Sequence, residues 1–162
     1  MLKPVQRRAF RADQAHFAIV ASQYNTRYVD AMLSAARAEL KRAGVRQVRV
    51  IRVPGAFEIP VVAARLASKA LLHPSLSAII CLGVILRGET VHAAHIGEAV
   101  SRALMQIQLD YEIPVIHEVL LLESEAQARA RCLGKTHNRG AEAAQTALAM
   151  AAVMKALVRR SA

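Results

Sequence analysis

Residues 76–86 have the sequence LSAIICLGVIL, an apolar run that decides the fold class. Its length and its isoleucine and valine residues predict a central strand that is buried on both faces. Three other runs, HFAIVAS, QVRVIRV and VIHEVLLL, predict further strands at 16–22, 47–53 and 115–122. A helical pattern follows each strand, which favours a parallel sheet with right-handed crossovers and helices on both faces.

The predicted helices are bounded by ordinary start and stop signals. Asn25 and Thr26 are candidate caps for the first helix, which Gly44 ends. Ser124 and Gln127 form a capping-box pattern that begins a short helix. The apolar spacing places the remaining helices at about 57–72, 91–110 and 141–159.

Chain length and composition predict a single folded domain. The chain has 162 residues, of which 54% are hydrophobic and 4% aromatic, a mixture that suits helices packed on a buried sheet. We expect residues 1–15, which are polar and basic, to form an N-terminal arm, and residues 16–160 to form one α/β domain. Because neither a secretory signal nor an apolar run of membrane-spanning length is visible, we expect a cytoplasmic protein.

The formal net charge of +10 raises nucleic acid as a partner. The cations are dispersed along the chain, however, and no aromatic residues alternate with them as a base-stacking surface requires. A solvated basic surface explains the charge better, and we expect no nucleic-acid partner. The same charge would raise the local concentration of phosphorylated small substrates.

Ligands of parallel α/β sheets bind beyond the carboxyl ends of the strands. This rule narrows the search for chemistry to four segments: 22–26, 54–58, 84–92 and 117–123. The first segment contains Tyr24, whose ring is suited to stacking on a planar heterocycle.

The second segment begins with a Pro54-Gly55 turn and contains Glu58. A turn of this kind exposes backbone amides, and a helix N-terminus stabilises a carboxylate through its dipole. Two interpretations remain open. Either Glu58 only caps the helix, or the carboxylate and the amides bind a ligand that carries hydroxyl or amide groups.

The third segment lies within the sequence GVILRGETVH (83–92), which has the features of an anion site. A turn at Gly88 enters a helix, and the first N–H groups of a helix are available to an anion. His92 is predicted in the first helical turn, where the dipole favours the neutral imidazole that accepts a proton near neutral pH. A structural histidine is the alternative, and His92 together with His95 does not by itself indicate zinc.

Arg131 and the turn GKTHNRG (134–140) form the last cluster of polar residues. Taken alone, this cluster is typical of a solvated helix end. It is also suited to phosphate, because a guanidinium binds phosphate through two parallel hydrogen bonds.

Four strings occur in order along the chain: VASQYN, VPGAFEIP, GVILRGETVHAAHI and RCLGKTHNRGAEAA. Together they resemble the lumazine synthase family over roughly residues 16–158. The resemblance implies a flavodoxin-like three-layer fold with a four-stranded parallel sheet. It also implies assembly into pentamers, decamers or sixty-subunit shells, active sites between adjacent subunits, and riboflavin synthase as a partner.

The reaction implied by the resemblance condenses 5-amino-6-(D-ribitylamino)uracil with L-3,4-dihydroxy-2-butanone 4-phosphate, without a metal or an organic cofactor. The products are 6,7-dimethyl-8-ribityllumazine, phosphate and water, in the penultimate step of riboflavin biosynthesis. His92 is implied as the proton-transfer residue, and Arg131 of an adjoining subunit as the phosphate ligand. The implied substrate-binding residues are Tyr24, Asn25, Ala56, Phe57, Glu58, Val84, Ile85, Leu86, Glu89, Thr90 and His117.

Each group of binding residues has its own implied role. Tyr24 stacks on the pyrimidine, while residues 56–58 and the backbone of residues 84–86 hold the ribityl chain and polar atoms of the amine. The amides of Glu89 and Thr90 bind the butanone phosphate.

The sequence departs from the family pattern along the wall that binds the pyrimidine ring. His117 stands where phenylalanine is common, and Glu118 where glycine is frequent. Tyr24 replaces the usual phenylalanine or tryptophan, and Ala93 follows His92 where an aromatic residue is often found. These changes leave His92 and the phosphate ligands in place.

Two other functions compete with this one. The altered wall also fits a weakly catalytic or non-catalytic paralogue that binds lumazine or flavin, or that acts as an assembly scaffold. A basic nucleic-acid-binding domain ranks last, because it does not explain the order of the four strings.

Overall fold

The computed structural model describes residues 12–72 and 76–160. Its single sheet has the strand order β2-β1-β3-β4, and all neighbouring strands are parallel. The first, third and fourth strands match the predicted ranges residue for residue, and the second begins one residue later than predicted. The strands are β1 (His16–Ser22), β2 (Val48–Val53), β3 (Leu76–Leu86) and β4 (Val115–Leu122).

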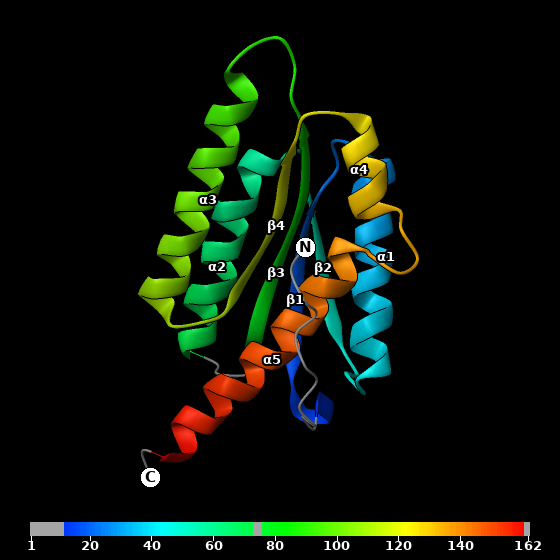
Figure 1. Ribbon diagram of the computed structural model, residues 1–162. Coiled ribbons are helices and arrows are strands. Elements are labelled where there is room, and N and C mark those ends of the chain that lie inside the picture. Colours follow the sequence, from blue (N-terminus) through cyan, green and yellow to red (C-terminus); the bar gives the residue numbers. More distant parts are fainter. Residues whose placement is uncertain (1–11, 73–75, 161–162) are drawn as a thin grey trace.

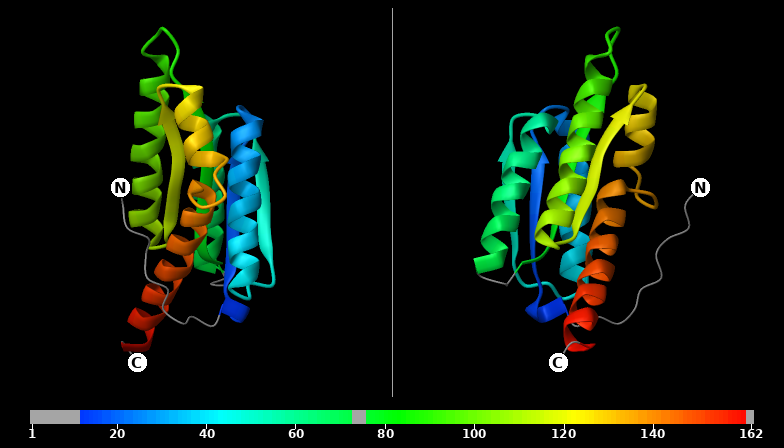
Figure 2. Two further views of the ribbon diagram at one scale, coloured as in Figure 1. Left: turned by 45° about the vertical axis from the view of Figure 1, so that its right-hand side comes forward. Right: turned by 90° about the vertical axis from the view of Figure 1, so that its left-hand side faces the viewer.

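Helices cover both faces of the sheet and complete three layers (Figures 1 and 2). One face carries α2 (Ile59–Leu72), preceded by the 3-10 turn η2 (Ala56–Glu58), and α3 (His92–Tyr111). The opposite face carries α1 (Thr26–Arg42), α4 (Glu125–Cys132) and α5 (Arg139–Arg160). This arrangement confirms the predicted flavodoxin-like architecture. The structure begins α5 two residues earlier than the apolar spacing indicated.

The core lies in two layers, because alternate residues of each strand point to opposite faces. Val20 and Cys81 pack towards α2 and α3, whereas Ile19 and Leu82 pack towards α1 and α5. The central strand β3 is buried along almost its whole length, which explains why its sequence is apolar without alternation.

Helix α5 packs unusually close to α1. Its buried face is made of alanines, and Gly140 lies directly against the backbone of Met32. The segment Arg139–Val158 also has the length and composition of a membrane-spanning helix, which the sequence analysis did not predict. Because the alanine face forms part of the core, we interpret α5 as a core helix of the domain.

Most of the predicted N-terminal arm, residues 1–11, lies outside the described residues. The last part of the arm includes the 3-10 turn η1 (Ala12–Gln14). Ala12 and Ala15 are both buried and contact the core layer that faces α1 and α5. The boundary at residue 15 stays a prediction.

Candidate active site

A groove of about 1310 Å³ lies at the carboxyl ends of the strands, between η2 and α3. It is lined by residues that follow each of β1, β2 and β3, as the rule for parallel sheets predicts. Nine of the predicted site residues line it: Tyr24, Asn25, Ala56, Phe57, Glu58, Ile85, Leu86, Thr90 and His92.

Asn25 holds the corner between β1 and α1 in place. Its backbone is left-handed, with φ of 57°, a conformation that asparagine tolerates better than most residues. The side-chain Nδ2 donates to the carbonyl oxygen of Val84 at 2.8 Å. The prediction that the Asn25 side chain caps α1 is therefore wrong, because the side chain bonds β3 and makes no cap hydrogen bond. Val84 is buried in the core layer that faces α1 and α5, and it does not line the groove.

Tyr24 and Phe57 present two aromatic rings at the groove. Tyr24 is 71% exposed and Phe57 is 61% exposed. The Tyr24 ring lies over Gly55, where a Cβ would meet ring atom Cδ2 at 3.0 Å. A side chain at position 55 would therefore displace the ring, and the exposed rings are available to a planar ligand.

Glu58 caps the turn that precedes α2. Its Oε2 accepts a hydrogen bond from the N–H of Gly55 at 2.8 Å, which is one half of a capping box, because glycine has no side chain to form the other half. The Gly55 amide is therefore used within the turn, contrary to the expectation that the Pro54-Gly55 turn leaves its amides exposed. Because the Glu58 side chain is exposed and lines the groove, its other oxygen remains accessible to a ligand.

The loop between β3 and α3 forms the far end of the groove and extends beyond the sheet (Figure 1). Arg87 is the first residue of this loop and anchors it to the end of β4. The Arg87 backbone N–H donates to the carbonyl oxygen of Leu122 at 2.8 Å, and the Arg87 guanidinium pairs with Glu123 at 3.0 Å. The N–H groups of Glu89 and Thr90 donate to no atom of the described residues. These amides are therefore available to an anion.

His92 begins α3 and lies, exposed to solvent, at this end of the groove. Its backbone N–H donates to the Thr90 hydroxyl at 3.4 Å. His95 lines the groove on the same helix face. No group of three or more histidine, cysteine or acidic residues close enough to hold a metal ion occurs within residues 12–72 and 76–160.

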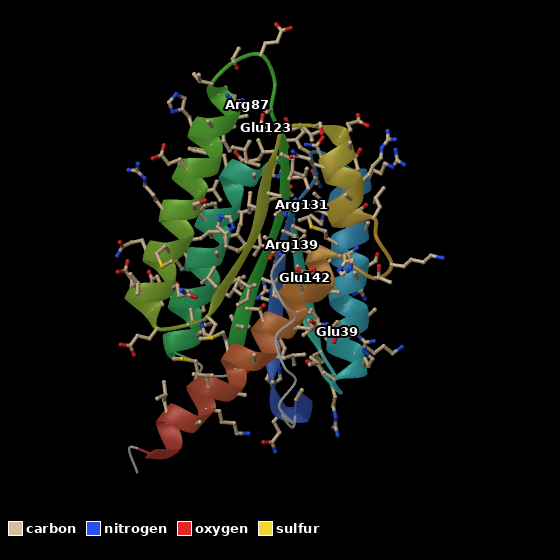
Figure 3. The ribbon with its side chains drawn as sticks, in the orientation of Figure 1. Glu39, Arg87, Glu123, Arg131, Arg139 and Glu142 are labelled. Carbon is tan, nitrogen blue, oxygen red and sulfur yellow. The ribbon has the colours of Figure 1, made fainter. Side chains whose placement is uncertain are left out.

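The two remaining predicted residues, Arg131 and His117, lie away from the groove. Arg131 is exposed in the last turn of α4, on the face of the sheet opposite to α3 (Figure 3). His117 is exposed on the edge strand β4, where its Nε2 lies 2.9 Å from the hydroxyl of Ser101. One chain therefore carries two separate groups of predicted site residues: those that line the groove, and Arg131 with His117, which lie outside it.

Sequence analysis missed an ion-pair cluster beside Arg131. Glu118 on β4 is 6% exposed, and Arg139 binds both of its oxygens. Burial raises the pKa of Glu118 to about 7, although the Arg139 guanidinium opposes this shift. Arg139 was predicted within a solvated helix end or a phosphate clamp, whereas the structure half-buries it and pairs it. The available signal was the position of Glu118 on the inward-facing side of β4, between Ile116 and Leu120.

Comparison with known proteins identifies the family of this chain. The family model described as 6,7-dimethyl-8-ribityllumazine synthase matches residues 14–155. The chain is 42% identical over 147 residues to the 6,7-dimethyl-8-ribityllumazine synthase of Stenotrophomonas maltophilia (strain R551-3), covering 90% of this chain and 92% of the relative. It is 40% identical over 149 residues to that of Xanthomonas oryzae pv. oryzae (strain PXO99A), covering 91% and 94%. The chain belongs to the 6,7-dimethyl-8-ribityllumazine synthase family.

Proposed function

We propose that this chain catalyses the reaction for which its family is named. In this reaction 5-amino-6-(D-ribitylamino)uracil condenses with L-3,4-dihydroxy-2-butanone 4-phosphate to give 6,7-dimethyl-8-ribityllumazine, phosphate and two molecules of water. One observation carries the proposal: a single groove collects two exposed aromatic rings, a carboxylate, an imidazole and a loop with available amides.

The amine substrate occupies the part of the groove near β1 and β2. Tyr24 stacks on the pyrimidine ring, and Phe57 contacts the ribityl chain beside it. The accessible oxygen of Glu58 accepts hydrogen bonds from the ribityl hydroxyl groups. Asn25 acts on the substrate indirectly, because its side chain fixes the corner that carries Tyr24.

The phosphate of the second substrate binds at the start of α3. The N–H groups of Glu89 and Thr90, in the bend just before α3, donate to no atom of the described residues, so they can donate to the phosphate oxygens. Arg131 of an adjacent subunit supplies the compensating positive charge through two parallel hydrogen bonds. The role of Arg131 is supported by its surroundings within one chain: it is exposed and has no ion pair among the described residues. His117 of the same adjacent subunit contributes to the wall that contacts the pyrimidine.

His92 moves protons during the condensation. The 5-amino group attacks the ketone carbon, and loss of the first water gives a Schiff base. Loss of phosphate and attack of the ribityl-bearing nitrogen then close the ring with loss of the second water. Each of these steps transfers a proton, and a neutral imidazole beside the phosphate can accept and return it. Because both substrates are intrinsically reactive, correct placement supplies most of the acceleration.

Assembly from pentamers explains how the two groups of residues meet. The family is oligomeric, and exposed apolar side chains surround the groove and continue along α3, as a subunit contact requires. These side chains are Tyr24, Phe57, Val61, Val91, Met105 and Leu109. We also infer that the enzyme works in the cytoplasm and passes its product to a riboflavin synthase.

A direct assay tests the proposed function. Purified protein is mixed with both substrates, and the absorbance and fluorescence of the lumazine product are followed together with phosphate release. We expect both products to appear at equal rates. Tight binding of lumazine without any turnover would contradict the proposal and indicate a non-catalytic paralogue.

The His92→Ala variant is expected to lose only part of the activity. General acid–base catalysis contributes about 10²-fold or more where it is essential, but reactive substrates held in place need less. We expect kcat to fall by about 10- to 100-fold, while the KM values for the two substrates change little. His95→Ala is the matched control, because His95 lies on the same helix and lines the same groove. A larger loss for His95→Ala than for His92→Ala would contradict the role assigned to His92.

A further inference from the structure

Glu118 is a charged residue in a position that the fold normally gives to an apolar one. Its neighbours on the same side of β4, Ile116 and Leu120, pack into the core that faces α1 and α5. The two Glu118 oxygens accept hydrogen bonds from Nε and Nη2 of Arg139, at 3.0 and 2.8 Å. Arg139 also binds Glu142 at 2.7 Å. This fork-shaped pair joins β4 to the first residue of α5.

The pair lies at the base of the turn that carries Arg131. Arg139 follows Asn138, whose side chain donates to the carbonyl oxygen of Cys132. Cys132 is buried and directly follows Arg131 at the end of α4. Figure 3 shows Arg131, Arg139 and Glu142 along the line where α4 ends and α5 begins. The Arg131 charge also lowers the pKa of Glu118, though less than Arg139 does, so the two charges interact weakly.

We propose that Glu118 is a positioning residue that sets how strongly the Arg131 end of the site binds the phosphorylated substrate. The proposal rests on the function proposed above. Glu118 acts through the two arginines: it fixes Arg139 and the turn, and its negative charge weakens the positive potential around Arg131.

The charge of this cluster changes near neutral pH. With Glu118 ionised, Glu118 and Glu142 balance Arg131 and Arg139, so the formal charge is zero. Since burial raises the pKa of Glu118 to about 7, protonation below that pH leaves a net positive charge beside Arg131. Protonation of Glu118 should therefore favour binding of the phosphate group.

Other groups near Glu118 do not account for such a change. Burial raises the pKa of the Cys132 thiol to about 11, so the thiol stays neutral through this range. His117 points to the opposite face of β4 and contacts Ser101. Lys135 and His137 are exposed in the connecting turn. They are retained in the variant described next, so a comparison with the wild type removes their contribution.

Glu118→Gln tests the proposal, because glutamine keeps the shape and one acceptor for Arg139 but carries no charge. KM for each substrate and kcat are measured for wild type and variant from pH 6 to pH 8. The ratio of wild-type to variant KM for the butanone phosphate should rise from about one at pH 6 to about three at pH 8. KM for the amine and kcat should stay within about twofold of the wild type.

Three outcomes would overturn the inference. A KM ratio that does not change with pH in an active enzyme shows that the Glu118 charge does not set phosphate binding, and this contradicts the inference. Equal changes in KM for both substrates indicate a purely structural role. Absence of lumazine formation by the wild type overturns the proposed function, and this inference with it. If Glu118→Gln does not assemble, Glu118→Gly takes its place, because glycine is frequent at this position in the resembling family, and the same rising ratio is expected.

Discussion

Replacing Arg131 by alanine is expected to lower kcat/KM for the butanone phosphate by about 10²-fold or more. In the proposed site, the Arg131 guanidinium is the only charged side chain that binds the phosphate. Loss of one partner from a desolvated, hydrogen-bonded charge pair costs about 2–5 kcal/mol. Because the amine substrate does not contact Arg131, its KM should change little. Steady-state kinetics with each substrate varied in turn measures both effects.

Arg129→Ala is the matched control for this variant. Arg129 lies on the same short helix, is exposed, and pairs with Glu125 at 3.0 Å. Its removal changes the charge of α4 by the same amount as the removal of Arg131. We expect Arg129→Ala to keep kcat/KM within about threefold, because an exposed ion pair contributes little. Near wild-type efficiency for Arg131→Ala would contradict the phosphate site.

Gly140→Ala is expected to cause the largest loss of stability. A Cβ at this position would lie 2.5 Å from the Cα and carbonyl carbon of Met32, and closer still to its carbonyl oxygen. Met32 is fully buried in α1, so its backbone cannot move without separating the two helices. Overpacking of this kind costs about 3 kcal/mol, which corresponds to a fall in Tm of about 10 °C for a chain of this size.

The control for Gly140→Ala is Gly97→Ala, which also places a methyl group on a helical glycine. At Gly97 the new Cβ would lie 3.6 Å from Leu121, an ordinary contact. We expect Gly97→Ala to be neutral or slightly stabilising, because alanine favours helix by about 1 kcal/mol over glycine. Thermal unfolding followed by circular dichroism distinguishes the two variants. Equal Tm values for Gly140→Ala and wild type would contradict the close contact between α1 and α5.

The layers of the fold could be predicted because local signals determine them. The apolar run 76–86 is rich in isoleucine and lacks helical spacing, which favours a strand covered on both faces. The end of α1 was also predictable, since Gly44 has φ of 87°, a conformation that glycine adopts without strain. Asn25 was harder, because its left-handed backbone and its bond to Val84 depend on β3, which lies far along the chain.

The site could be predicted in part for the same reason. Residues after β1, β2 and β3 converge on one groove because parallel strands all end at one edge of the sheet. The partner of Glu118 could not be identified from local sequence, since Arg139 reaches it only through the packing of α5 on β4. The order of the four strings likewise did not indicate that His92 and Arg131 lie on opposite faces of the sheet. Sequence order does not say on which face of the sheet each segment lies.

In the proposed site, groove residues on the α3 side of one sheet and Arg131 on the α4 side of a neighbouring sheet together form each active centre. A single folded copy would then be inactive. Loss of the contact surface between subunits would abolish turnover, whereas loss of His92 removes only part of it.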